Sequence, residues 1–201
     1  RLLAGFALDP YPVFTYAAEA FSLRKSVAMV HGEHTVVILY ELLRAEGPVQ
    51  VELRPYFAGR DYHHLVRAND MVRRQAGFDG GGLHYQPYPG QPLVHLLAAD
   101  ARYVAQPDWY YNFQYPREQE RGLDSSEDLF TVGTLSCTLQ PQQALGVIVS
   151  TDDPRGRDPQ ALLAAERQRR GQLVAAVGDD PIVQRLALAA GADLRACLRH
   201  G

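Results

Sequence analysis

Apolar and polar residues alternate along much of the first 150 residues of the chain. Between Val49 and Leu53 the apolar side chains fall on one face and the polar ones on the other, which is typical of a half-buried β-strand. Residues 26–30 and 35–40 form two further strand-like runs around a His-Gly-Glu-His turn, which indicates a hairpin. Comparable runs recur at intervals of about ten residues, separated by glycine- and proline-rich turns. The pattern predicts a mainly β domain with an antiparallel β-sandwich fold.

The pattern becomes helical after Thr151. A polar linker leads to Asp158-Pro159, which places a helix N-cap before a proline at the first helical position. The residues from Ala161 to Val177 are mostly strong helix formers, and Gly178 ends the run. We therefore expect one or two C-terminal α-helices after the sandwich.

A second helix is indicated by the repeated start signal Asp180-Pro181. Its apolar stripe consists of Ile182, Val183, Leu186 and Ala190. Such a stripe needs a partner, either further helices or a second copy of the chain in a homo-oligomer. We accordingly divide the chain into a sandwich domain over residues 1–151, a linker with its helix over 152–178, and the start of a helical domain over 179–201.

Composition narrows the function classes. The 201 residues include 20 basic and 23 acidic side chains that are mixed along the chain, with a net charge of −3, so no nucleic-acid partner is expected. No apolar run approaches the roughly 20 residues of a membrane span. The two cysteines are too few for a disulfide framework, which favours a cytoplasmic setting.

The sequence indicates neither a cofactor nor a metal site. His31, Glu33 and His34 lie around a turn and do not form a helical His-Glu-x-x-His motif, so we interpret them as exposed turn residues. The glycine run at residues 80–82 lacks the Lys-Ser/Thr of a phosphate-binding loop, and no Gly-x-Ser-x-Gly elbow occurs.

Two segments combine aromatic rings with hydrogen-bonding side chains, a mixture that suits a sugar with its apolar ring faces and polar edges. The candidate substrate-binding residues are Arg60, Asp61, Tyr62, His63, Trp109, Tyr110, Asn112, Tyr115, Glu118 and Arg121. The competing interpretation places the aromatic rings in the core and the charged residues on solvated loops.

Four segments, in order along the chain, carry a resemblance to a known family. They are Phe6 to Tyr16, Leu23 to Val37, Leu53 to Pro55 with Arg60 to His63, and Trp109 to Phe130. Together they resemble the N-terminal domain of bacterial and archaeal glycogen debranching enzymes of the amylo-α-1,6-glucosidase type. The resemblance implies a supersandwich-like β domain, joined by a linker helix to an (α/α) barrel that hydrolyses α-1,6-linked glucose in glycogen.

The sequence departs from the family pattern at both ends. Residues 195–201 carry charge where an apolar helix would continue, and the family usually has further strands before Arg1. The resemblance therefore implies a truncated chain whose catalytic barrel is missing. The two catalytic carboxyl groups of the family lie in that barrel, so no catalytic residue is assigned to this chain.

Three hypotheses follow. The first is a non-catalytic domain that packs on its own helical barrel and helps to form a cleft for α-glucans such as glycogen and malto-oligosaccharides. The second is a stand-alone carbohydrate-binding module. The third is a hydrolase that uses an acidic cluster, and we disfavour it because the cluster falls in one polar loop without a defined carboxyl separation. The cluster consists of Glu118, Glu120, Asp124, Glu127 and Asp128.

Overall fold

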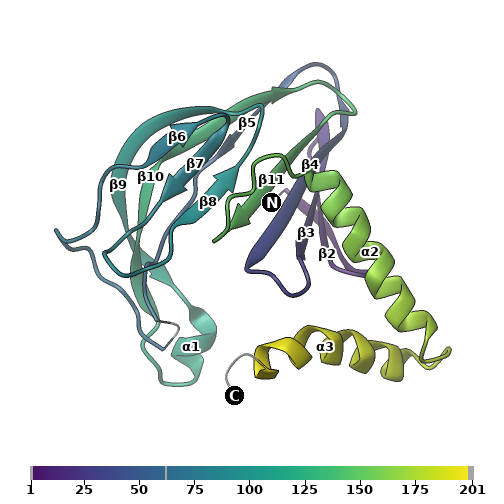
Figure 1. The fold of residues 1–201 in the computed structure, drawn as a ribbon. Helices are drawn as coiled ribbons and strands as arrows, with labels where there is room; N and C mark the ends of the chain where they lie inside the picture. Colours follow the sequence, from purple (N-terminus) through teal and green to yellow (C-terminus); the bar gives the residue numbers. More distant parts are fainter. Residues whose placement is uncertain (1, 62, 199–201) are drawn as a thin grey trace. The chain divides into compact units, whose positions relative to one another are not determined.

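A computed structural model of the chain describes residues 2–61 and 63–198, with only the backbone described for residues 191–198. The chain forms two compact units. The first contains Arg1–Val49 and Leu139–Gly201, and the second contains Gln50–Thr138. Antiparallel strands build both units and helices follow the last strand (Figure 1), so the predicted mainly β fold class is confirmed.

The first unit is built on a sheet of five antiparallel strands in the order β1-β2-β3-β4-β11. These strands are β1 (Leu3–Leu8), β2 (Pro12–Ala17), β3 (Phe21–Met29), β4 (Thr35–Ala45) and β11 (Ala144–Ser150). In the centre of the sheet Ile38 lies opposite Val27 on one side and Val147 on the other. Val37 and Leu39 are buried in the hydrophobic core, as the run of β-branched and apolar residues in β4 predicts.

Helix α2 (Pro159–Ala175) packs against β3, β4 and β11 (Figure 1). It begins where the sequence predicts, because the carboxylate of Asp158 accepts a hydrogen bond from the Gln160 amide at 3.0 Å. Leu163 is buried on this helix and joins Tyr11 and Leu39 in one core cluster. Few apolar residues of α2 are buried, so apolar contacts alone hold it weakly.

Charged side chains supply the remaining attachment of α2. Glu166 is buried and accepts a hydrogen bond from the His31 amide at 2.8 Å. Arg169 bonds the same carboxylate at 3.0 Å, and Arg170 donates to the Pro10 carbonyl at 2.9 Å. Burial acts to raise the pKa of Glu166, but the bonds from Arg169 and His31 outweigh it and lower that pKa overall. The carboxylate therefore stays ionised and ties the helix to the turn after β3.

In the β3–β4 turn His34 is exposed as expected, whereas His31 and Glu33 are half-buried. Glu33 forms a double ion pair with Arg157 at 2.7 and 3.0 Å. Within the described residues no group of three or more metal-ligating side chains occurs. No helix in the described part of the chain is long and apolar enough to cross a membrane.

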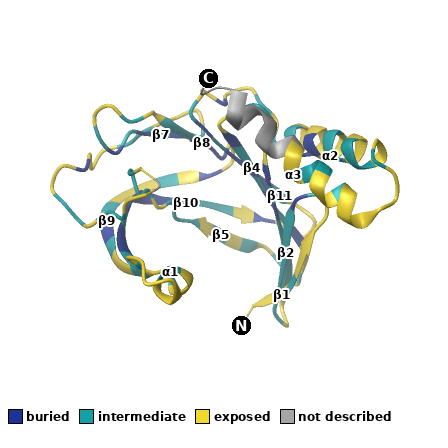
Figure 2. Cartoon of the chain, turned by 90° about the horizontal axis from the view of Figure 1, so that it is seen from below, coloured by how far each residue is buried: buried dark blue, intermediate teal, exposed yellow. Residues whose placement is uncertain are grey.

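Helix α3 (Pro181–Leu198) follows α2 and packs against it. Asp180 caps it by accepting a hydrogen bond from the Ile182 amide at 2.8 Å. The predicted apolar stripe is exposed (Figure 2), with Ile182 71% and Leu186 63% exposed.

The second unit contains two groups of strands and a short helix. A three-stranded sheet has the order β5-β10-β9, and an antiparallel meander has the order β6-β7-β8. The elements are β5 (Val49–Leu53), β6 (Gly77–Asp79), β7 (Gly82–Tyr85), β8 (Val94–Leu97), β9 (Arg102–Gln114), α1 (Pro116–Glu120) and β10 (Ser126–Leu139).

An aromatic cluster forms the core of the second unit. The ring of Phe57 meets Tyr85 edge-on at 4.8 Å, and Trp109 meets Phe130 edge-on at 5.2 Å. Tyr85 and Phe130 stack at 6.3 Å and connect the two pairs. Edge-on and offset contacts between aromatic rings are favourable, so this cluster contributes to stability beyond its buried area.

Gly146 on β11 allows α2 to approach the sheet closely, since a Cβ atom there would lie 2.5 Å from Pro159. We expect Gly146→Ala to lower the free energy of unfolding by about 1–3 kcal/mol, because the start of α2 must move. The control is Gly171→Ala inside α2, where a Cβ meets nothing within 4 Å. That change raises stability by about 0.5–1 kcal/mol through helix propensity. Urea unfolding measures both, and equal effects would contradict the packing argument.

The exposed stripe of α3 predicts uneven protection of the two helices. Amide hydrogen exchange should be slow in α2 around Leu163 and much faster from Ile182 to Ala190, because few apolar contacts hold the latter. Light scattering on the same sample establishes whether the chain is monomeric. Strong protection of Ile182 to Ala190 in a monomer would show this prediction to be wrong.

Candidate functional site

An open groove of about 1020 Å³ lies in the second unit. Its lining comes from two stretches of the chain, residues 60–67 and 115–126. The lining residues are Arg60, His63, His64, Leu65, Arg67, Tyr115, Glu118, Leu123, Asp124, Ser125 and Ser126. Four predicted site residues are therefore brought together: Arg60, His63, Tyr115 and Glu118.

The second stretch owes its shape to helix α1 and its ends. Pro116 occupies the first turn of the helix, where its missing N–H costs nothing. Gly122, with a φ of 72°, ends the helix in the left-handed region and allows the Leu123 amide to bond the Glu118 carbonyl at 3.0 Å. The chain then returns so that the Tyr115 amide bonds the Ser125 carbonyl at 2.7 Å. The loop is thereby closed on itself.

A buried carboxylate, Glu127 on β10, lies beneath the groove. It accepts two hydrogen bonds from Arg60, from Nε at 2.8 Å and from Nη2 at 2.9 Å. The Tyr115 hydroxyl and the Val66 amide donate to the same carboxylate, the latter at 3.3 Å. Two parallel bonds from one guanidinium are the strongest form of this pairing, so Glu127 fixes the orientation of both Arg60 and Tyr115.

The protonation states in this network follow from the same contacts. The hydrogen bonds from Arg60 lower the pKa of Glu127, while Glu127 raises the pKa of Arg60. Burial, assisted by Glu127, raises the pKa of Tyr115. At neutral pH the groove therefore has a guanidinium and a neutral phenol held against an ionised carboxylate.

Asp128, the next residue, holds the backbone on either side. It accepts hydrogen bonds from the Ala68 amide at 3.0 Å and from the Asn112 amide at 2.9 Å. The Ala68 bond is the main reason that the pKa of Asp128 is lowered. Asn112 has a φ of 60°, a conformation that asparagine tolerates better than most residues. The backbone amide of Asn112 is thus held by Asp128, and the predicted role of Asn112 in binding stays a prediction.

Other predicted site residues do not line the groove. Trp109 is only 7% exposed and donates from Nε1 to the Asn69 carbonyl at 3.3 Å, so it belongs to the core. Tyr110 meets Tyr56 edge-on at 5.1 Å and has the guanidinium of Arg54 over its ring at 5.2 Å. Trp109 is therefore buried in the core and the half-buried Tyr110 packs on neighbouring side chains, and neither lines the groove.

Asp61 and Arg121 lie within the two lining stretches in sequence but do not line the groove themselves. Asp61 accepts a hydrogen bond from the His63 amide at 2.8 Å, which shapes the first stretch. Arg121 forms an exposed ion pair with Glu118 at 3.4 Å. Tyr62 lies outside the described residues.

Comparison with known proteins places this architecture in a family. Residues 1–145 match the family model described as glycogen debranching enzyme N terminal. The chain belongs to this family. Among solved structures it is similar to a "Putative kojibiose phosphorylase from human microbiome", with a TM-score of 0.35 and 8% sequence identity. That match covers 90% of this chain and 22% of the other, so the chain spans about a fifth of that protein. No curated protein matches the chain.

The structure corrects the interpretation of the acidic cluster in this debranching-enzyme N-terminal domain. Glu127 and Asp128 do not lie in a polar loop with Glu118, Glu120 and Asp124, because both belong to β10 and are buried. A register shift between Glu127 and Leu129 disturbs the usual alternation at this point. In the sequence, the apolar run that follows Asp128 indicates a strand, and this strand, β10, begins before the run, at Ser126.

These two carboxylates are poorly suited to glycoside hydrolysis. A general acid of a glycosidase needs a raised pKa, whereas those of Glu127 and Asp128 are both lowered. Their oxygens are engaged by Arg60, by Tyr115 and by backbone amides. In this N-terminal domain they position other groups.

The lowered pKa of Glu127 predicts an acid-sensitive fold. Its ionised form stabilises the chain above the pKa of the unfolded carboxyl, and this contribution is lost as the pH falls through the lower folded pKa. We expect Glu127→Gln to cost about 3 kcal/mol at pH 7, since it breaks a buried pair, and to lessen the loss of stability on acidification below about pH 4.

The matched control is Glu118→Gln, which removes an exposed pair and should cost less than about 1 kcal/mol. Denaturant unfolding as a function of pH measures both variants. An unchanged stability of Glu127→Gln at pH 7 would contradict the anchoring role of Glu127.

Proposed function

We propose that this chain is the non-catalytic N-terminal domain of a glycogen-debranching glucosidase of the amylo-α-1,6-glucosidase type. Its groove contributes to the surface that binds α-glucan. Family membership over residues 1–145 supports the parent activity. The observation that carries the binding role is the groove itself, with Arg60 and Tyr115 fixed by the buried Glu127.

The chemistry of the groove favours a neutral ligand with many hydroxyl groups. Its lining has cationic side chains, carboxylates, a phenol and two serines, so donors and acceptors are interspersed. Glu118 and Arg121 already form an ion pair at the edge. A saccharide bonds donors and acceptors alike, whereas an ion of either sign would meet like charges among these side chains.

The proposed parent enzyme places catalysis in a helical (α/α) barrel, and α3 is the surface that would meet it. Helix α3 packs against α2 and exposes an apolar stripe formed by Ile182, Val183 and Leu186. A stand-alone carbohydrate-binding module would have no use for this stripe, so we rank that alternative second. A homo-oligomer is the other way to cover it.

We also propose a cytoplasmic location. Cys137 is half-buried and free of a disulfide, which suits a reducing compartment. Burial raises the pKa of its thiol, so it is a poor nucleophile at neutral pH. Glycogen, the proposed substrate of the parent enzyme, is a neutral polymer and requires no cofactor for its recognition.

Two neighbouring glutamates on α1 provide the test of the groove. Glu118 lines the groove and Glu120 does not, although both lie on the same short helix. The 201-residue chain should be retarded by glycogen in native affinity electrophoresis. Glu118→Ala should weaken this retention about three- to tenfold through the loss of a hydrogen bond, and Glu120→Ala should leave it unchanged.

A second variant tests whether weaker retention on glycogen could arise from a change in the fold. Tyr115→Phe removes the hydroxyl that bonds Glu127 and keeps the ring in the groove. It should weaken retention while circular dichroism stays unchanged. Equal retention of Glu118→Ala and Glu120→Ala, or no retention of the unmodified chain, would count against a glucan-binding groove.

A further inference from the structure

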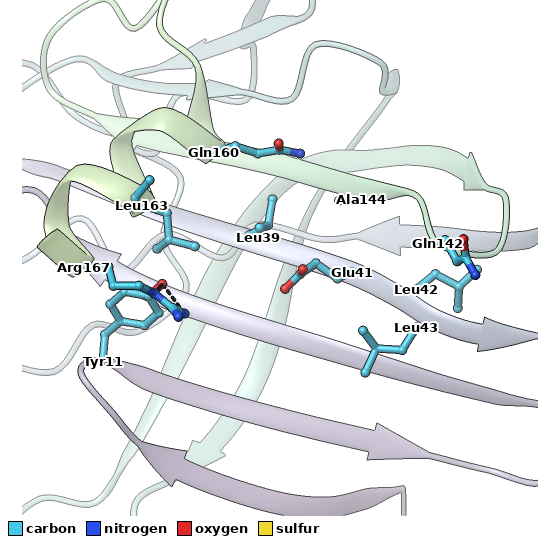
Figure 3. A pocket seen from close by; sticks show the side chains of 11 residues that line it. Tyr11, Leu39, Glu41, Leu42, Leu43, Gln142, Ala144, Gln160, Leu163 and Arg167 are labelled. Carbon is cyan, nitrogen blue, oxygen red and sulfur yellow. Dashed lines mark hydrogen bonds between the residues drawn. The ribbon is translucent and has the colours of Figure 1, made fainter.

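A second cavity lies in the first unit, where the N-terminal half of α2 meets the sheet (Figure 3). Its volume is about 450 Å³, within the range of small-molecule sites. The lining residues are Tyr11, Leu39, Glu41, Leu42, Leu43, Gln142, Ala144, Gln160, Leu163, Ala164 and Arg167. The groove described above belongs to the other unit and shares none of these residues.

Regular secondary structure places most of this lining. Leu39, Glu41 and Leu43 are alternate residues of β4 and therefore project from one face of the sheet. Ala144 lies opposite Glu41 on β11. The wall on α2 consists of Gln160, Leu163, Ala164 and Arg167, whose spacing of three and four residues puts them on one side of the helix. Strands and a helix therefore form most of the cavity, and Tyr11 and Gln142 join it from the segments before β2 and before β11.

The charged groups of the cavity are already engaged. Glu41 accepts two hydrogen bonds from Arg24, both at 2.7 Å. Arg167 donates to the Tyr11 hydroxyl from Nε at 3.2 Å and from Nη2 at 3.1 Å (Figure 3). Arg24 neutralises the charge of Glu41, whereas Arg167 bonds only the neutral hydroxyl of Tyr11 and keeps its positive charge. A cationic ligand is therefore disfavoured, and both side chains can bond a ligand that carries hydroxyl groups.

Two amide side chains are available to such a ligand. Neither Gln142 nor Gln160 bonds another described residue through its side chain. Each amide has a donor and an acceptor, as each hydroxyl of a sugar has. Between them the exposed Leu43 and the two alanines provide apolar surface for the C–H faces of a sugar ring.

We propose that this cavity is a second saccharide-binding site, which takes one or two glucose residues at the end of an α-glucan chain. The class of ligand, a polyhydroxylated ring, is inferred because the lining combines amides, a carboxylate and a guanidinium with apolar surface. The choice of α-glucan rests on the proposed function.

The site lacks an aromatic ring face for stacking. Tyr11 is 1% exposed, and the guanidinium of Arg167 covers its ring at 5.4 Å. Since stacking on aromatic rings supplies much of the affinity in sugar sites, we expect a dissociation constant of about 1 mM or weaker. Such a site is useful toward a branched polymer, because many chain ends raise the effective concentration of the ligand.

Two adjacent alanines of α2 give a matched test. Ala164 lines the cavity, Ala165 does not, and both are exposed. Maltose should shift the backbone amide signals of α2 and β4 in the 201-residue chain in a saturable way. Ala164→Trp fills the cavity and should weaken this binding at least about tenfold, whereas Ala165→Trp should change it less than about twofold.

A second pair tests the amide. Gln160→Leu keeps the size of the side chain and removes its hydrogen bonds, so it should weaken maltose binding about three- to tenfold. Gln168→Leu, at an exposed position of α2 outside the lining, should have no effect.

The proposal is overturned if maltose produces no saturable shifts around the cavity, or if Ala164→Trp and Ala165→Trp bind equally. Glu118→Ala in the groove should leave the shifts around α2 intact. Retention on glycogen that depends on Glu118 without any maltose shift at α2 removes this second site and leaves the proposed function standing. Loss of both shows that the proposed function itself is wrong.

Discussion

The buried carboxylate of Glu127 is the constraint on which the groove depends. With an exposure of 0% it remains ionised only because hydrogen bonds replace its lost hydration. Arg60 and Val66, in the first lining stretch, donate some of these bonds. Tyr115, in the second stretch and 12 residues before Glu127, donates another. One buried charge thus sets the relative position of both walls. Removal of Arg60 would leave Glu127 as a buried charge without its ion-pair partner, which makes this pair specific as well as stabilising.

Glu166 plays the corresponding part in the first unit. Helix α2 is rich in arginine and glutamine, and Leu163 is its only apolar side chain that is fully buried among the described residues. A helix of this composition lies on a sheet because Glu166 bonds the His31 amide and because Arg167 and Arg170 reach Tyr11 and the Pro10 carbonyl. The same contacts keep the wall of the second cavity in place, so the attachment of the helix and the shape of the cavity have one physical origin.

Local sequence patterns predict most of the strands and helices, whereas contacts between distant residues determine which side chains are buried and which line the groove. Val49–Leu53 was predicted as a strand and is one, and both Asp-Pro pairs begin helices as capping chemistry requires. Trp109 and Tyr110 were assigned to one site, yet adjacent residues of a strand face opposite sides, and only Trp109 is buried. Glu127 resembled a loop residue because carboxylates are seldom buried. Its partner Arg60 lies 67 residues away, a distance over which no local pattern carries information.

The protonation states and contacts of Glu127 and Asp128 can be compared with what glycoside hydrolysis requires. Catalysis of glycoside hydrolysis needs one carboxyl group that holds a proton at neutral pH and another placed across the scissile bond. In the groove the buried carboxylates have lowered pKa values and hold a guanidinium, a phenol and backbone amides in place. A binding surface has the opposite requirement, since its donors must be fixed before the ligand arrives if the entropy cost of binding is to be small. The lowered pKa values and the engaged oxygens of Glu127 and Asp128 therefore suit the fixing of donors at a surface better than acid catalysis.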